Sequence, residues 1–444
     1  MKNRIVFILA ISPCFYSLPG QAVQKPDATV SLTDSNFFTQ TQLNMTLRNQ
    51  WKYLKENEAQ PKTVHNAWGQ AIQFDYLSGY LWDVVGVDAT WNRAIKLGAS
   101  DYFVTRGLLY NHGEGMDKEN AHGFSKFGQR YLKLKLGNDS TGIKAKAGWQ
   151  ALTNFGVLTT ANRLSRNSYL GYSSTFNWQK LSLDAAYVTK AIRFDSPQSL
   201  HLETNDKKNI RAIYTAGVTY RQPDNLFSYS WGEADNYLRR HRLEAAWQIA
   251  PAWHLSSQVY GSEGLDKYTS MPASKREFDR HAWHYVGQAQ WQNNGWKQRM
   301  VLAWTSAPRR NGVGYYARPL TKNTRGRFNA LTSAGKDYMR DKELALVSLT
   351  EYQFIRDLVS GIQLNYGQFS YKNQTVRSGE VALVNSWNPS TRALKNLSVF
   401  TLFGYGVSYK NNRETPLFND QGKPVRSPSL SAEIAINYKF GLFN

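Results

Sequence analysis

The sequence predicts an all-β protein, a transmembrane antiparallel β-barrel of about 18 strands with one loop folded inward as a constriction. Three observations lead to this fold class. Many segments alternate residue by residue between an apolar and a polar face, as strands do. Their connections broadly alternate between short turns and long loops. Aromatic residues make up 14% of the chain, with 14 Trp and 26 Tyr, which is typical of a barrel with aromatic belts at both membrane interfaces.

The alternation is clearest in residues 143–150, where odd positions are apolar and even positions are Lys, Gly or Gln. Segments of the same kind lie at 42–51, 71–76, 85–92, 132–136, 181–187, 214–221, 227–231, 242–249, 283–291, 299–305, 362–366 and 434–440. The second face of these strands carries too many small and charged residues for a soluble barrel without a pore. The apolar face therefore suits lipid, and backbone groups in lipid must pair internally, which requires a closed barrel.

The connections divide into two sets by length. Short turns lie at 137–142, 179–180, 222–225, 250–252 and 293–295, and long segments at 96–127, 152–168, 191–209, 262–280, 306–342 and 410–429. Asp235 and the 372–378 link are short exceptions. This alternation predicts long loops at one rim and turns at the other. We expect the polar loop at 153–168 to fold into the barrel and narrow it.

The N-terminus reads as a secretory signal at residues 1–22, with Lys2 and Arg4 before an apolar run and cleavage expected after Ala22. The barrel domain would then occupy residues 23–444. The only cysteine, Cys14, lies inside the signal, so disulfide and thiolate chemistry is excluded from the mature chain. No run of 18 apolar residues occurs, which excludes transmembrane helices.

The chain is strongly basic, with a formal net charge of +21. Such a charge often indicates nucleic-acid binding, but an exported barrel meets little nucleic acid. We therefore expect loop Lys and Arg to contact lipopolysaccharide phosphates and outer-membrane lipids. Basic residues that face the pore would attract anionic solutes.

Candidate pore-lining residues come from the loop and from strand parity. Arg163 and Arg166 lie on the 153–168 loop, where a guanidinium pair can hold a carboxylate in a dehydrated pore; the alternative is a structural bond to loop carbonyls. Arg240 and Arg242 share a polar strand face, although rim contacts with lipopolysaccharide are an alternative for Arg240, and Glu244 can neutralise Arg242. Further lumen-facing candidates are Lys144, Lys146, Arg221 and Arg299.

A second group of candidates, Tyr315, Tyr316 and Arg318, lies in the longest later loop. These residues are positioned to line a vestibule, and exposed tyrosines there would stack on sugars. Packing within the loop is the alternative role for the tyrosines.

Several segments resemble the OprD family of substrate-selective outer-membrane porins: 47–51, 69–75, 78–80, 85–89, the Asn162-Arg163-Leu164 triplet, 171–172, 178–187 and the final strand. The resemblance implies an 18-stranded unit with an inward loop, a ladder of Arg and Lys on one pore wall, and passage of small solutes down their gradient. The last strands depart from the pattern, because 397–403 and 431–434 contain no arginine. Segments 187–191, 200–203, 314–318 and 326–328 are instead similar to the chitoporin branch.

Catalysis is disfavoured because His241, His254, His281 and His284 form no catalytic constellation at fixed spacing, and no metal-ligand run or phosphate loop occurs. We therefore expect a porin in the cell outer membrane of a Gram-negative bacterium, with no cofactor and no metal. It would pass small solutes passively, with carboxylate-bearing anions preferred. Oligosaccharide passage is the main alternative and a barrel enzyme the third. The barrels would act as a monomer or a homotrimer.

Overall fold

The computed structural model describes residues 36–56, 63–101, 107–113, 115, 117–331, 337–412 and 415–443. The signal peptide expected at residues 1–22 lies outside these ranges. Within them almost all regular structure is β-strand, and no helix is long and apolar enough to cross a membrane.

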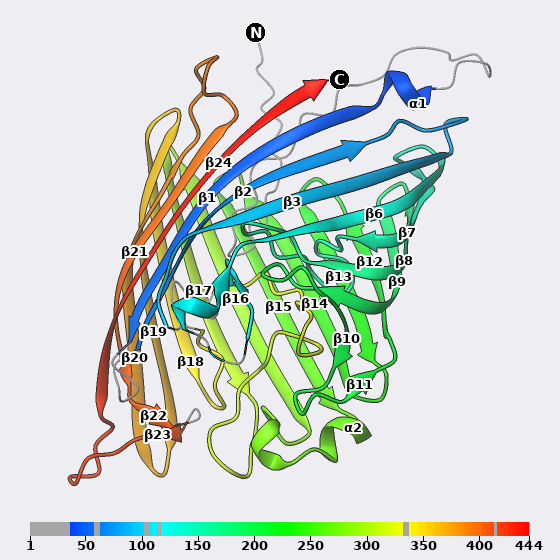
Figure 1. Ribbon diagram of the computed structural model, residues 1–444. Helices are drawn as coiled ribbons and strands as arrows, with labels where there is room; N and C mark the ends of the chain where they lie inside the picture. Colours follow the sequence, from blue (N-terminus) through cyan, green and yellow to red (C-terminus); the bar gives the residue numbers. More distant parts are fainter. Residues whose placement is uncertain are drawn as a thin grey trace.

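The barrel strands form one antiparallel sheet that closes on itself (Figure 1). The sheet contains 20 strands, of which β10 (Ser199–Glu203) and β11 (Asn209–Ile210) only extend the rim, so 18 strands make the wall of the described chain. Each wall strand pairs with the next along the chain, and β24 pairs with β1 to complete the ring. The predicted antiparallel β-barrel and its strand number are confirmed.

The wall strands have the following bounds: β1 (Gln42–Glu56), β2 (Thr63–Leu77), β3 (Val85–Ala99), β6 (Phe124–Gly137), β7 (Thr141–Gln150), β8 (Ser168–Trp178), β9 (Leu181–Ile192), β12 (Ile213–Arg221), β13 (Asn225–Ala234), β14 (Leu238–Ala250), β15 (Trp253–Gly264), β16 (His281–Asn293), β17 (Trp296–Ser306), β18 (Leu344–Ile355), β19 (Leu358–Tyr371), β20 (Gln374–Trp387), β21 (Leu397–Tyr409) and β24 (Arg426–Phe443).

The short elements outside the wall strands are α1 (Asn36–Thr39), β4 (Tyr110–Asn111), η2 (Lys118–Asn120), β5 (Ala121–His122), α2 (Asp266–Thr269), η3 (Ala273–Lys275), β22 (Asn411–Asn412) and β23 (Thr415–Pro416). In Figure 1, α2, β11, β22 and β23 gather at the lower rim, while the C-terminal end of β24 points to the opposite rim. The long loops therefore share one rim, as the alternation of connection lengths predicts.

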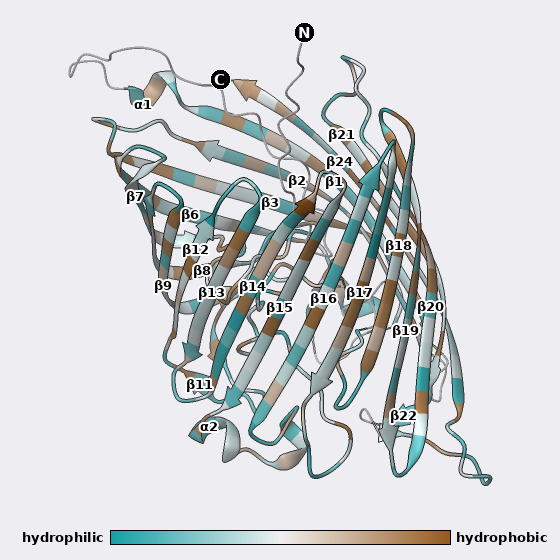
Figure 2. Ribbon diagram, turned by 180° about the vertical axis from the view of Figure 1, so that it is seen from behind, coloured by the Kyte–Doolittle hydropathy of each residue, from teal (hydrophilic) through white to brown (hydrophobic). Residues whose placement is uncertain are grey.

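Strand β16 shows how alternating residues give the barrel wall an apolar outer face and a polar inner face. Trp283 and Tyr285 are 37% and 40% exposed on the outward face, whereas His284 between them is fully buried on the inner face. Exposed apolar side chains recur on other wall strands, for example at Tyr229, Leu243 and Leu302. Figure 2 shows apolar and polar residues following one another along the strands. Lipid would cover this outer face, and the inner face is left to polar groups.

Tight turns join strands at the rim opposite the long loops. Asn294 and Gly295, between β16 and β17, both have positive φ, at 46° and 81°. Two-residue hairpin turns require this left-handed conformation because it matches the twist of the flanking strands, and Asn-Gly tolerates it best. The sequence placed this turn correctly.

Candidate functional site

The 151–167 loop leaves β7 and returns to β8, yet its tip binds strands that are not their neighbours. Arg48 of β1 donates from Nη1 to the carbonyl oxygen of Arg163 at 2.6 Å and to Oδ1 of Asn162. Asn92 of β3 donates from Nδ2 to the carbonyl oxygen of Leu164 at 2.9 Å. Arg48 and Asn92 belong to the polar strand faces, so the loop tip is attached to the inner side of the β1–β3 wall.

A buried leucine provides the apolar half of this attachment. Leu164 has 0% exposure and packs among Ala67, Ala71, Ala94, Leu108 and Leu109. A Cβ at Gly69 would lie 2.4 Å from Cδ1 of Leu164, so glycine leaves room for this side chain. Burial of a leucine side chain stabilises the attachment by about 1.5–3 kcal/mol.

A second loop, residues 307–343, pairs with the first through backbone hydrogen bonds. Thr159 N donates to the carbonyl of Arg325 at 2.9 Å, and Arg327 N donates to the carbonyl of Val157 at 2.8 Å. An isolated bridge joins Leu158 to Gly326 between them. The two loops therefore form one connected unit, which nothing in the sequence pattern indicates.

Arg240 anchors the second loop to β14. Its guanidinium donates to the carbonyl oxygens of Ala317 at 2.7 Å, Pro319 at 3.3 Å and Arg318. The side chain points to the inner face, as strand parity predicts, but it is only 1% exposed. The prediction that Arg240 lines the open pore therefore requires correction, because the 307–343 loop covers it.

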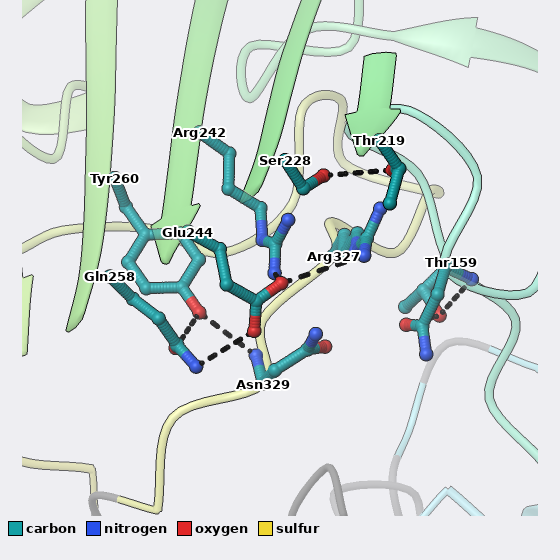
Figure 3. A network of polar contacts seen from close by, with 10 residues as sticks. Thr159, Thr219, Ser228, Arg242, Glu244, Gln258, Tyr260, Arg327 and Asn329 are labelled. Atoms are coloured by element: carbon teal, nitrogen blue, oxygen red, sulfur yellow. Dashed lines mark hydrogen bonds and ion pairs between the residues drawn. The ribbon is translucent and has the colours of Figure 1, made fainter. Parts of the chain in front are cut away.

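Arg242 is covered in the same way and is 1% exposed. It is paired with Glu244, as the sequence suggested, and this pairing is confirmed. Gln258 donates to Glu244 at 3.2 Å, Tyr260 donates to Gln258 at 2.5 Å, and Asn329 N donates to the Tyr260 hydroxyl at 3.0 Å. Figure 3 shows this network reaching from the wall strands to the second loop. Arg242 is thus part of the loop attachment rather than an exposed pore residue.

The vestibule candidates lie within the same packed region. Tyr316 is buried, with its ring 5.0 Å from the Arg240 guanidinium carbon. Tyr315 is half-buried and donates its N–H to the carbonyl of Glu277. Arg318 is half-buried, pairs with Asp337 and lies 4.6 Å from the Phe328 ring. Loop packing, the alternative reading of the tyrosines, fits Tyr316, so its vestibule role is corrected.

Arginines gather where the loops meet. The guanidinium carbons of Arg163, Arg325 and Arg193 lie 4.8, 5.4 and 5.7 Å from the centre of the Phe194 ring. Arg193 is held by Asp195 through two hydrogen bonds of 2.9 and 2.8 Å. Burial, and next the positive charges of Arg163 and Arg318, lower the pKa of Arg325 to about 10. We call Arg163, Arg318 and Arg325 the arginine cluster.

Arg163 and Arg318 of this cluster are among the residues predicted from the sequence, whereas Arg325 and Phe194 are not. Loops have no periodicity that would show which side chains meet. The only available signal was composition, since Arg325 and Arg327 stand two residues apart in a loop already rich in arginine.

Arg166 lies at the β1 side of the loop tip and is half-buried. Its charge acts on Arg48 and on Lys439 of β24. The tip of the 151–167 loop therefore carries positive charge at both Arg163 and Arg166.

Lysines oppose one another directly on β6 and β7, as Lys133 with Lys146 and Lys135 with Lys144. Carboxylates reduce the resulting repulsion: Lys133 pairs with Asp88 at 2.7 Å, Lys135 with Asp83 at 2.7 Å and Lys144 with Asp139 at 2.6 Å. Lys146 instead lies 4.8 Å from the Tyr131 ring.

The two remaining lumen candidates differ in environment. Arg299 is buried and paired with Glu351 at 3.0 Å. Arg221 is exposed at the turn end of β12. Arg299 is therefore neutralised by the wall, whereas Arg221 lies at the rim.

Comparison with protein families gives a match to the model described as outer membrane porin, OprD family, over residues 35–307. The chain belongs to the OprD family. It is accordingly an outer-membrane β-barrel porin of a Gram-negative bacterium, in a family of small-solute channels. No curated protein matches the sequence.

Solved structures share this fold at low sequence identity. OpdK of Pseudomonas aeruginosa, solved with vanillate, is 14% identical with a TM-score of 0.70 over 91% of this chain and 100% of that one. OccK8 (OprE) of the same organism is 15% identical, with a TM-score of 0.71 over 92% and 100%. OccAB4 of Acinetobacter baumannii is 16% identical, with a TM-score of 0.69 over 92% and 100%.

Proposed function

We propose that this OprD-family porin passes small anionic solutes, carboxylate-bearing nutrients above all, by passive diffusion through a basic constriction. The observation that carries the proposal is the arginine cluster at the junction of the two loops. Guanidinium groups bind carboxylates through two parallel hydrogen bonds, and a partly dehydrated site strengthens the attraction. The channel acts by diffusion and performs no catalysis.

The attachment of the loops supports the constriction. The 151–167 loop is bound to the inner side of β1 and β3 and is paired with the 307–343 loop. Together the two loops would reduce the open cross-section of the barrel. Its hydrogen bonds to Arg48 and Asn92 and the buried Leu164 would keep the cluster in a fixed position. Selective passage needs binding that attracts a solute and still releases it, and neighbouring carboxylates such as Asp337 and Asp195 moderate the cationic field.

Oligosaccharide passage is the second candidate, based on the likeness of four segments to chitoporins. Sugar channels need exposed aromatic faces on which sugar rings can stack. Tyr316 is buried against Arg240 and Phe194 is enclosed by arginines. These placements favour the anionic solute over the sugar.

The experiment is solute block of single-channel current in a planar bilayer, comparing small carboxylates with chitooligosaccharides of similar size. We expect carboxylates to block the wild type, and Arg163→Gln to weaken that block by roughly tenfold or more, as for loss of a charged hydrogen bond. Arg221→Gln removes an equal charge at the exposed turn end of β12 and serves as the matched control. Block by the sugars alone would replace the proposal with the second candidate.

A further inference from the structure

The wall behind the 307–343 loop contains more buried positive charge than the described residues neutralise. Arg242 of β14 and Arg327 of the loop share one carboxylate, Glu244: Arg242 forms an ion pair with it, and Nη2 of Arg327 lies 3.9 Å from its Oε2. The Arg242 and Glu244 side chains are 1% and 2% exposed, and that of Arg327 is 13% exposed. Two guanidiniums therefore face a single carboxylate.

Asp184, a second carboxylate that acts on Arg327, does not neutralise the remaining positive charge. Asp184 of β9 acts on Arg327 less strongly than Glu244 does, and it already accepts a hydrogen bond of 2.6 Å from Thr175. Burial, and next the charge of Arg242, lower the pKa of Arg327 to about 10. The uncompensated positive charge of Arg242 therefore destabilises the charged form of Arg327.

Several donor atoms around this pair form no well-aligned hydrogen bond among the described residues, although the Tyr260 hydroxyl also interacts with Arg242. They are Nε and Nη1 of Arg242, Nε of Arg327 and Oγ of Ser230, all buried. Ser230 lies directly opposite Arg242 in the β13–β14 register. Figure 3 shows the Arg242 and Arg327 guanidiniums both directed at the Glu244 carboxylate. Buried polar groups in proteins almost always have hydrogen-bond partners. We therefore expect an acceptor beside these guanidinium and hydroxyl donors.

We propose that a small monovalent anion, of halide or formate size, binds between Arg242 and Arg327 and fixes the 307–343 loop to the barrel wall. An anion can accept a charge-assisted hydrogen bond from each of the two guanidiniums and offset the excess charge, whereas a water molecule is neutral and offers two lone pairs. This structural anion site is separate from the arginine cluster and does not depend on which solute the pore passes.

The direct experiment is diffraction from wild-type crystals soaked in sodium bromide, with data collected at the bromine absorption edge. The proposal predicts an anomalous peak within hydrogen-bonding distance of both guanidiniums. Bromide found solely on exposed loop cations would be an adventitious ion only, and would overturn the proposal. Since the wild type is used, failure of a variant to fold cannot obscure the result.

A solution experiment tests the consequence for the loop. The temperature at which folded barrel converts to the unfolded form on a detergent gel is measured against bromide concentration, with bulky isethionate keeping the ionic strength constant. Ligand that binds only the folded state must raise this temperature. We expect a rise of several degrees for the wild type and none for Arg327→Gln.

Lys322→Gln is the matched control, because Lys322 lies in the same loop and also pairs with a carboxylate, Glu203, at 3.9 Å, but its side chain is 43% exposed. The control should keep the full bromide response. An equal response in Arg327→Gln and Lys322→Gln would contradict the proposal. Carboxylate block through Arg163 is measured separately, so failure of the anion site leaves the proposed function untouched.

Discussion

Arg48→Met should release the tip of the 151–167 loop from the β1 wall. Met keeps most of the apolar stem of Arg48 but removes its two hydrogen bonds, to the Arg163 carbonyl at 2.6 Å and to Asn162. Each hydrogen bond from a charged donor contributes about 1.5–3 kcal/mol, so loss of the two should weaken the attachment by at least roughly 3 kcal/mol. That corresponds to a shift on the order of a hundredfold toward the detached loop.

Single-channel recording measures this release. We expect larger mean conductance, more current noise in the open channel and weaker carboxylate block, because the detached tip also displaces Arg163. Lys52→Met is the matched control, since Lys52 lies on the same face of the same strand but pairs with Glu433 at 2.7 Å. Unchanged conductance, noise and block in folded Arg48→Met would refute the reasoning that Arg48 holds the loop.

Three further predictions concern the other contacts of the loops. Leu164→Ala should destabilise the same attachment by about 2–5 kcal/mol, the range for leucine deletions in packed sites, seen as greater current noise with the barrel still folded. Arg240→Met removes the donors to three loop carbonyls, so limited proteolysis should cut the 307–343 loop faster than in the wild type, and equal rates would contradict the anchoring role. Burial raises the pKa of Glu277, which accepts hydrogen bonds from Asn205 and Tyr268. Because the folded-state pKa lies above the unfolded value, this contribution to stability is present at low pH and is lost as pH rises through the folded pKa. Hydrogen exchange in residues 265–280 should therefore accelerate as pH rises, after correction for intrinsic rates, and Glu277→Gln should remove that dependence.

Much of the fold was readable because strands in a membrane barrel obey a strict period of two. The alternation at residues 143–150 and the Asn-Gly turn at 294–295 each fix a strand or a turn from local sequence. Parity also paired Arg242 with Glu244 correctly, since residues two apart on a strand share a face.

Parity gives the direction of a side chain but not what covers it. Arg240 and Arg242 do point inward, yet a loop about 75 residues later in the chain buries them. Arg325 and Phe194 were missed for a related reason, because they meet only through contacts between separate loops. Arg48 stood in a recognised segment, 47–51, but nothing local connects it to a loop more than 100 residues away.

The reversal potential under asymmetric potassium chloride tests the basic constriction most directly. We expect an anion-selective potential in the wild type that moves toward zero in Arg163→Gln and further in the double variant with Arg325→Gln. Arg221→Gln should change it little. A cation-selective potential, or one unaltered by both cluster substitutions, would contradict the claim that the arginine cluster governs what passes.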